Sequence, residues 1–569
     1  MSQKPSFTGS QYKEYLGEFK DEFNNVLAGL QESDFPKRIL EKDFTLWSSS
    51  PDEIVNRLGW LHPPDANSEE AQSIKQFYSN ISGQDFTSVL LLGMGGSSLA
   101  PEMFAKVFPG LNDLEIRVLD STDPDYIKAV RAGIDLKKTL VIVSSKSGST
   151  VETASLMNYF LGEFSSEMEK DQVGKHFVSI TDPGSDLENI SNSLKFLKVF
   201  INNPDIGGRF SALSYFGLVP ASLTGIDLNI FMESSGSEAA LCQVNDTNTN
   251  HGLRLGALIG SLAEKGIDKL TIFTSGEIDS LKYWIEQLVA ESTGKNGKGV
   301  LPVPEFSTGI KYGKDRCIVY IKIKGDTKAD SELSEIEKNG CPLVVLELND
   351  TYDLARQIYL WEFATAVAGH VLRLNPFDQP DVESAKVFTR SFVKKYQETG
   401  TLEKQTPDFS IGDINFTSSI KAGDIDAFNN WLAGCAKAGS YISVQAFLNP
   451  GKEMEQKVSD FKELLASGFG VAVTVGFGPR YLHSSGQLHK GDAGKGFFIQ
   501  LTSDIGNDIP IPDKPFSDSS SLSFGILKNA QALGDYGALE KKGRNIVNIN
   551  LGSDALSGMD RLMEIFQHG

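Results

Sequence analysis

The apolar positions of the chain fall into short runs that alternate with helical patterns. Between about residues 86 and 202, such runs end near Gly93, Asp120, Ser145 and Asn202. A second series has apolar runs at KLTIFTS, CIVYIKI and CPLVVLEL. Strands that alternate with helices predict parallel sheets, whose ligands bind at the carboxyl ends of the strands. The pattern therefore predicts an α/β fold with two successive doubly wound sheets.

The two ends of the chain follow other patterns. Aromatic residues such as Tyr12 and Tyr15 lie among charges near the N-terminus and predict an amphipathic helical segment. Towards the C-terminus, polar loops precede apolar runs at YISVQAFL, VAVTV, GFFIQLT and NIVNINL, which predict further α/β structure. We expect an N-terminal helical segment at 1–45, a first sheet domain at 46–225, a second at 226–400 and a C-terminal α/β section at 401–569.

A hydroxyl-rich loop joins a predicted strand to a predicted helix in VIVSSKSGSTVET, residues 141–153. The strand is β-branched and apolar, and Met157, Phe160 and Phe164 then follow helical spacing. Unpaired backbone N–H groups at the start of a helix favour an anion. The alternative is that Ser149 or Thr150 only caps the helix. The candidate anion-binding residues are Ser145, Lys146, Ser147, Ser149 and Thr150.

A similar loop lies upstream in SVLLLGMGGSSLAPEMF, where Gly96 and Ser97 stand between a strand and a helix. The two loops could converge on one phosphate. GMGGSS is only a partial dinucleotide fingerprint, because its sixth position is Ser98 instead of a third glycine. Asp120 ends the next strand, beyond the usual distance of about 20 residues for a ribose-binding acid. The loops therefore favour a phosphate ligand over a nicotinamide cofactor.

Three further stretches carry candidate chemistry. GGRFS puts Arg209 beside paired glycines, which let a ligand approach the backbone. SLKYWIEQLVAES predicts a helix with Gln287 and Glu291 on one face, and the position of Glu291 in the last turn favours a base near neutral pH. NPFDQPDVESAK carries Lys386 after a rigid turn, where it could hold charge or donate a proton. For each of the three charged residues, the alternative is a solvated side chain.

Aromatic and basic residues gather after a predicted strand in GFGPRYLHSSGQLHKG, which holds His483 and His489. Their density is typical of a loop at a functional site, and the alternative is a pair of histidines without a role. A metal site is disfavoured, because the spacing is not that of HExxH and the basic neighbours oppose a cation. His370 lies among apolar residues in a predicted helix, so we expect it to be structural.

Length, charge and cysteine content reduce the number of possible partners and compartments. At 569 residues the chain exceeds what one core usually supports. Its net charge of −20 disfavours nucleic acid and anionic membranes as partners. No apolar run approaches the ~20 residues that span a bilayer, and the N-terminus lacks an apolar signal segment. Four cysteines without a CxxC pair indicate a reducing compartment. We therefore expect a cytoplasmic protein.

Five motifs together resemble the glucose-6-phosphate isomerase family. They are GMGGSS, SSKSGSTVET, GGRFS, QLVAESTGK and NPFDQPDVESAK, and they occur in the family's order. The later stretches GFGPRYLHSSGQLHKG and SFGILKNAQALGD look most like the isomerase half of bacterial proteins that fuse transaldolase to the isomerase.

The resemblance implies an enzyme that interconverts D-glucose 6-phosphate and D-fructose 6-phosphate through a cis-enediol, without metal or cofactor. The loop residues would hold the phosphate, Gln287 would line the sugar, and Glu291 would move the proton between carbons 2 and 1. Arg209 would stabilise the enediol, a preorganised electrostatic role. Lys386 and a histidine would open the ring.

The histidine is where this chain departs from longer members of the family. Those carry a GQHAF-like motif between the catalytic glutamate and the FDQ motif, which is missing here. His483 is therefore the first candidate for ring opening and His489 the second.

Two alternative functions stay open. A related enzyme would also accept mannose 6-phosphate, and a non-catalytic sensor would bind a sugar phosphate through the same domains. A sensor needs the phosphate loops but has no need of Glu291, Arg209 and Lys386 together. The resemblance also implies a homodimer.

Overall fold

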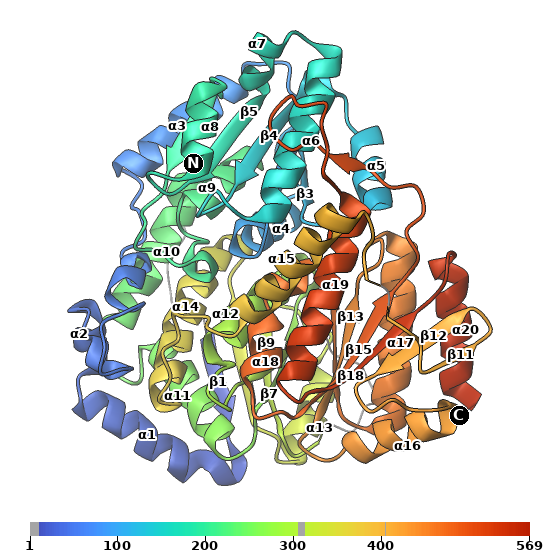
Figure 1. Cartoon of the computed structure of the whole chain (residues 1–569). Coiled ribbons are helices and arrows are strands. Elements are labelled where there is room, and N and C mark those ends of the chain that lie inside the picture. Colours follow the sequence, from blue (N-terminus) through green and yellow to red (C-terminus); the bar gives the residue numbers. More distant parts are fainter. Residues whose placement is uncertain (1–10, 305–312, 404, 569) are drawn as a thin grey trace.

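The computed structural model describes residues 11–304, 313–403 and 405–568. These residues form three larger sheets with helices packed around them (Figure 1). Within the described residues, no helix combines the length and the apolar character needed to cross a lipid bilayer.

The first sheet is entirely parallel, with the strand order β3-β2-β4-β5-β6. Strand β3 lies on one side of β2, and β4 lies on the other side, where the order continues through β5 to β6. The strand order therefore reverses its direction between β2 and β4, which is the switch point of this doubly wound sheet. Both of these strands are buried along their whole length. The strands are β2 (Ser88–Gly93), β3 (Glu115–Leu119), β4 (Thr139–Ser144), β5 (Phe177–Thr181) and β6 (Lys198–Ile201).

The second sheet repeats this order in its four parallel strands, β8-β7-β9-β10. Its helices α11 (His251–Glu264), α12 (Leu281–Thr293) and α14 (Leu354–Val371) pack together, and α14 is almost wholly buried. The strands are β7 (Lys269–Thr274), β8 (Leu301–Val303), β9 (Arg316–Ile323) and β10 (Leu343–Leu348).

An N-terminal strand completes the edge of the second sheet. β1 (Gln11–Tyr15) pairs antiparallel with β10, so Tyr12 and Tyr15 are extended, and the helical prediction is wrong for these residues. Helices begin only afterwards, at α1 (Lys20–Glu32) and α2 (Phe35–Leu40). Distant pairing overrides the local pattern here, because the main chain of β10 offers hydrogen bonds that the sequence near Tyr12 does not reveal.

The C-terminal section contains a third sheet with the same order in its parallel strands, β14-β13-β15-β18, and an apolar core of its own. Antiparallel strands β12 (Ile414–Ser418) and β11 (Phe409–Ile411) extend its edge. The parallel strands are β13 (Tyr441–Ala446), β14 (Ala472–Phe477), β15 (Gly496–Thr502) and β18 (Asn545–Asn550).

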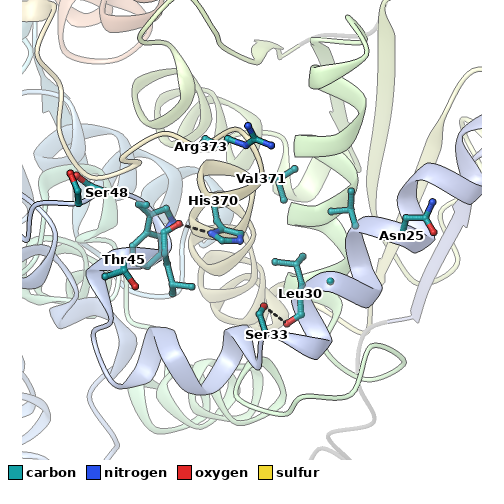
Figure 2. A pocket seen from close by; sticks show the side chains of 13 residues that line it. Asn25, Leu30, Ser33, Thr45, Ser48, His370, Val371 and Arg373 are labelled. Atoms are coloured by element: carbon teal, nitrogen blue, oxygen red, sulfur yellow. Dashed lines mark hydrogen bonds between the residues drawn. The ribbon is translucent and has the colours of Figure 1, made fainter.

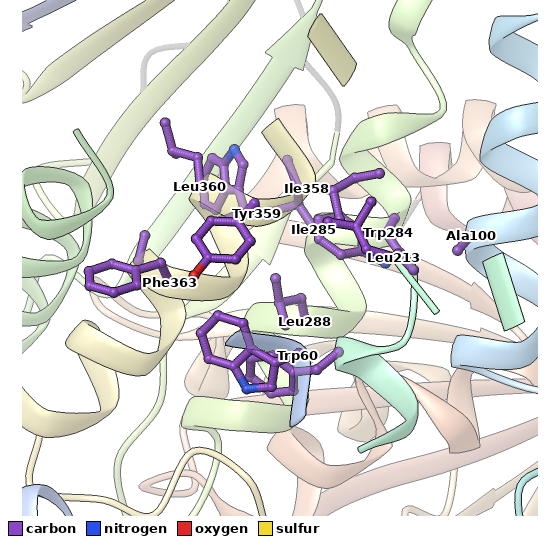
Figure 3. Close-up of a cluster of buried hydrophobic side chains, with 14 of the residues drawn as sticks. Trp60, Ala100, Leu213, Trp284, Ile285, Leu288, Ile358, Tyr359, Leu360 and Phe363 are labelled. Carbon is purple, nitrogen blue, oxygen red and sulfur yellow. The ribbon is translucent and has the colours of Figure 1, made fainter. Parts of the chain in front are cut away.

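The first two sheets share one apolar core (Figure 3). Trp284 and Leu288 of α12 lie there beside Tyr359 of α14 and Trp60, with no more than 3% of any of these side chains exposed. Burial of aromatic groups of this size fixes the position of a helix. The core therefore holds α12 rigidly, which matters because α12 carries Gln287 and Glu291.

Helices α15 (Val382–Thr399) and α19 (Phe524–Lys541) join the C-terminal section to the rest of the molecule. They run side by side in Figure 1, and Gly534 of α19 faces Thr389 of α15. The third sheet is therefore packed against the first two.

Candidate active site

The two predicted phosphate loops lie side by side. They follow β2 and β4, where Gly93 is the register partner of Ser144. The first loop leads into α4 (Gly96–Val107) and the second into α6 (Val151–Glu167). Thr150 occupies the N-cap position of α6, but its side chain does not cap the helix, and Gly95 has no side chain with which to cap α4. The start of α6 therefore presents N–H groups without a side-chain cap at the switch point of the first sheet, whereas the amides of Ser97 and Ser98 in α4 donate to the carbonyls of Met94 and Gly95.

Hydroxyl groups cluster in the second loop. The hydroxyl of Ser145 accepts a hydrogen bond from the amide of Gly148 (3.2 Å), and that of Ser149 donates to Ser147 (3.0 Å). Ser147 and Ser149 are exposed, as an incoming ligand requires, and Ser97 is partly exposed in the first turn of α4. These hydroxyls add neutral donors to the backbone N–H groups.

Lys146 does not join this hydroxyl cluster. Its ammonium forms an ion pair with Asp182 and donates to the carbonyl of Pro204 (2.8 Å). The structure therefore brings the other predicted loop residues together and directs Lys146 to a neighbouring loop.

Arg209 is 3% exposed and is held by several elements at once. Its Nε donates to Ser292 Oγ (2.8 Å), and its Nη2 donates to the carbonyls of Pro376 (2.7 Å) and Asp378 (2.9 Å). The preceding residue, Gly208, lies so close to Gly96 that a Cβ on Gly96 would overlap the Gly208 carbonyl oxygen. The first phosphate loop and the arginine therefore meet directly.

Glu291 and Gln287 lie on one face of α12, as predicted. Arg209 Nη1 is 3.1 Å from Glu291 Oε1, and Gln287 Nε2 donates to Glu291 Oε2 (3.2 Å). The same Nε2 donates to the backbone oxygen of His483 (2.8 Å). Gln287 Oε1 is buried and has no hydrogen-bond partner among the described residues. A carboxylate, a cation and an open amide acceptor thus converge beside the phosphate loops.

His483 reaches this place from the C-terminal section. Its Nε2 is 2.9 Å from Glu152 Oε1, and Gln531 of α19 donates to the same oxygen (2.7 Å). Burial alone would raise the pKa of Glu152, but the charge and hydrogen bond of His483 hold that pKa below its ordinary value. Since an ionised carboxylate only accepts hydrogen bonds, Nε2 carries the hydrogen and Nδ1 is left to exchange a proton.

Two groups in this arrangement were not predicted. Glu152 lies inside a motif that the sequence analysis used, but its partner is hundreds of residues away. Lys295 is 1% exposed and donates to Asn375 O (2.8 Å) and Asp378 Oδ1 (2.7 Å), beneath Arg209. Burial and the charge of Arg209 lower the pKa of Lys295 to about 8. The available sequence signal was that Lys295 follows the predicted helix of Gln287 and Glu291. Since most lysines are solvated, this position alone does not predict a buried lysine at the site.

The structure does not bring His489 to the site. The ring is 1% exposed and lies within 3.3 Å of Ser443 Oγ and 3.2 Å of Gln445 Nε2, inside the third section. Burial, with Lys490 and Arg544, holds the pKa of His489 far below its ordinary value. The predicted role in substrate binding has no support in this placement, because a short helix, α18 (Gly486–Gly491), turns the ring inward.

Lys386 stands on α15 with half of its side chain exposed, and Glu383 is 3.9 Å away. Its positive charge nevertheless helps to lower the pKa of Glu152. Lys386 therefore acts on Glu152 through its charge, and among the described residues no hydrogen bond joins Lys386 to the His483–Glu152 pair.

A separate surface cavity of about 830 Å³ lies beside His370 (Figure 2). His370 Nδ1 is 2.5 Å from the Leu46 carbonyl, and the lining comes from α1, the segment around Thr45 and the end of α14. This histidine ties the N-terminal segment to α14. Among the described residues, no group of three or more His, Cys, Asp or Glu side chains is placed to hold a metal ion.

Two doubly wound parallel sheets, with hydroxyl-rich loops at the switch point of the first, give an α/β fold of the sugar-isomerase type. A family model described as phosphoglucose isomerase matches residues 68–314. A probable glucose-6-phosphate isomerase of Methanococcus maripaludis is 28% identical over 375 residues, 59% of this chain and 84% of that protein. The chain is therefore similar to phosphoglucose isomerases, and the family model covers residues 68–314.

Two solved structures bear on the fold alone. A hypothetical protein from Thermus thermophilus superposes with a TM-score of 0.56 at 22% identity, covering 67% of this chain and 99% of that chain. A glucose-6-phosphate isomerase from Chlamydia trachomatis gives 0.56 at 19% identity, covering 69% and 90%. Both support the paired-sheet architecture.

Proposed function

We propose that this protein is an aldose–ketose isomerase that interconverts D-glucose 6-phosphate and D-fructose 6-phosphate. The observation that carries the proposal is the placement of Glu291 between Arg209 and Gln287, next to the uncapped start of α6 and the loop that leads into α4. Proteins that match this chain bear the same activity in their names. The reaction belongs to glycolysis and gluconeogenesis.

Substrate binding begins at the phosphate. The loops after β2 and β4 offer N–H groups and the hydroxyls of Ser97, Ser147 and Ser149 to a dianion. The sugar then extends toward α12, where Gln287 Oε1 accepts a hydrogen bond from a sugar hydroxyl. His483 Nδ1 exchanges the proton that ring opening requires, with Lys386 as the nearby cation.

Proton transfer follows in the open chain. Glu291 removes the proton from carbon 2 of the aldose, and the electrons form the carbon 1–carbon 2 double bond of a cis-enediol. A proton passes from the oxygen on carbon 2 to the oxygen on carbon 1, and the same carboxyl group returns its proton to carbon 1, so the atoms balance without a redox partner. Arg209 lies where negative charge develops on the enediol oxygens, and its fixed hydrogen bonds make that stabilisation preorganised.

A coupled assay tests the proposal. Chelator-treated protein is given fructose 6-phosphate, and glucose 6-phosphate formation is followed, with mannose 6-phosphate run in parallel. Turnover of fructose 6-phosphate is expected, and the ratio of the two rates measures tolerance of the epimer. Tight binding of a sugar phosphate without turnover would overturn the isomerase and favour a sensor.

Three further expectations belong with this function. Cys242, Cys317, Cys341 and Cys435 are all free thiols, which supports a cytoplasmic location. The net charge of −20 supports a small sugar phosphate as partner and opposes nucleic acid. The homodimer stays a prediction, and light scattering of the purified protein tests it.

A further inference from the structure

The loop after β3 is covered by the C-terminal section. Asp120 lies too far along the chain to act as the ribose-binding acid of a dinucleotide site, so the sequence assigns it no role. This aspartate accepts a hydrogen bond from Arg480 Nε (2.7 Å). The same guanidinium reaches Glu102 of α4, with Nη1 2.9 Å from Oε2. Opposite charges on the first and third sheets therefore meet at this loop.

Two more contacts come from α19. Thr122 donates to Gln531 Oε1 (3.0 Å), and Lys528 Nζ is 2.8 Å from Asp123 Oδ2. The side chains of Lys528 and Asp123 are only 4% and 6% exposed. We call residues 120–123 the β3 latch, because three of the four contact the third section.

The latch is linked to His483 along two short routes. Arg480 and His483 are the first and last residues of one 3-10 turn, Arg480–His483. Gln531 accepts from Thr122 with Oε1 and donates to Glu152 with Nε2, and Glu152 holds His483. A shift of the third section at the latch would therefore displace the imidazole from Glu152.

We propose that Arg480 is a positioning residue, which binds the β3 latch and Glu102 and thereby sets His483 at the site. The inference rests on the proposed isomerase function, because it assigns His483 to ring opening. Glu291 and Arg209 belong to elements of the other two sheets, and the turn of His483 reaches this pair indirectly, through the hydrogen bond that Gln287 donates to the backbone oxygen of His483. Enediol chemistry should therefore depend on the latch less than ring opening does.

The ion pairs of the latch are buried on the side of Asp120, Asp123 and Lys528, whereas the side chain of Arg480 is 31% exposed. Removing one member of a buried ion pair leaves the other uncompensated, which costs far more than loss of an exposed pair. Arg480 and Lys528 face Asp120, Glu102 and Asp123 across the junction. A neutral side chain at 480 would therefore release the turn that carries His483.

Arg480→Gln tests the proposal, with Arg561→Gln as the control, since Arg561 forms an exposed ion pair with Asp413 in the same section. Two readouts separate the roles: kcat and KM with fructose 6-phosphate, and calorimetric Kd for 5-phospho-D-arabinonate, an acyclic mimic of the enediolate. We expect kcat of Arg480→Gln to fall about 100-fold, the scale of general acid–base catalysis. KM and the Kd should change less than about threefold.

Two results would overturn the inference. An unchanged kcat would show that His483 needs no latch, and an equal loss of kcat and arabinonate binding would mean general damage to the fold. Arg480→Lys, which keeps the charge, should recover part of kcat, and circular dichroism checks the folding of each variant. If wild-type protein has no isomerase activity, the proposed function fails, independently of Arg480.

Discussion

A buried arginine sets the surroundings of the proposed base at the residue scale. Arg209 shares its guanidinium among Ser292, the turn at Pro376 and Asp378, and Glu291. The guanidinium therefore cannot turn away when substrate arrives, and the developing negative charge meets an oriented cation.

Glu291→Gln should abolish turnover while leaving ligand binding largely intact. The amide keeps the size of the side chain but cannot take a proton, so kcat should fall by about 10²–10⁴. The coupled assay measures kcat, and calorimetry with 5-phospho-D-arabinonate measures binding. Glu277→Gln is the control, because Glu277 is exposed on the segment just before α12. Near-normal turnover of Glu291→Gln would exclude Glu291 as the base.

At the scale of elements, the start of α4 and the turn of Arg209 touch without room for a side chain. Gly96→Ala should separate them, because the new Cβ would overlap the carbonyl oxygen of Gly208. We expect a loss of about 1–3 kcal/mol in the free energy of unfolding and weaker phosphate binding. Urea unfolding and calorimetry measure the two effects.

Gly208→Ala gives the matched control on the other side of the same contact. A Cβ on Gly208 meets no atom within 4 Å, so this variant should unfold like the wild type. Equal effects of the two substitutions would contradict the steric explanation.

Sequence patterns predicted the elements that depend on local composition. Buried strands such as β2 and β4 read as continuous apolar runs, and α12 shows its spacing directly. The face that joins Gln287 to Glu291 follows from that spacing. Strand β1 could not be predicted, because its partner β10 is remote. For the same reason no pattern linked Glu152 to His483, or Lys295 to the turn below Arg209.

At the scale of the whole molecule, the junction between the first and third sheets should respond to acid. Burial alone would raise the pKa of Glu102, but the charges of Arg480 and Lys106 lower it to about 2. The folded protein then binds fewer protons than the unfolded chain between pH about 2 and the ordinary pKa of 4.5. The stabilisation is therefore complete above that pKa and is lost as the pH falls toward 2.

Urea unfolding of the wild type and of Glu102→Gln across this pH range measures the effect. The difference in free energy of unfolding should be on the order of 2 kcal/mol at neutral pH and should shrink toward zero near pH 2. Glu41→Gln is the control, because Glu41 and its partner Lys37 are both exposed. A difference that does not change with pH would contradict the assignment of charge to Glu102.

The pairing of β1 with β10 also has a consequence for how the chain is made. The ribosome produces β1 well before β10, which follows the strands of the first sheet and the other parallel strands of its own sheet. At about 5–20 residues per second, the strand waits on the order of tens of seconds for its partner. Lys13 and Glu14 place charges in the middle of the waiting strand, a composition that discourages pairing with strands of other nascent chains. The N-terminal strand therefore leaves the ribosome long before the strand with which it pairs.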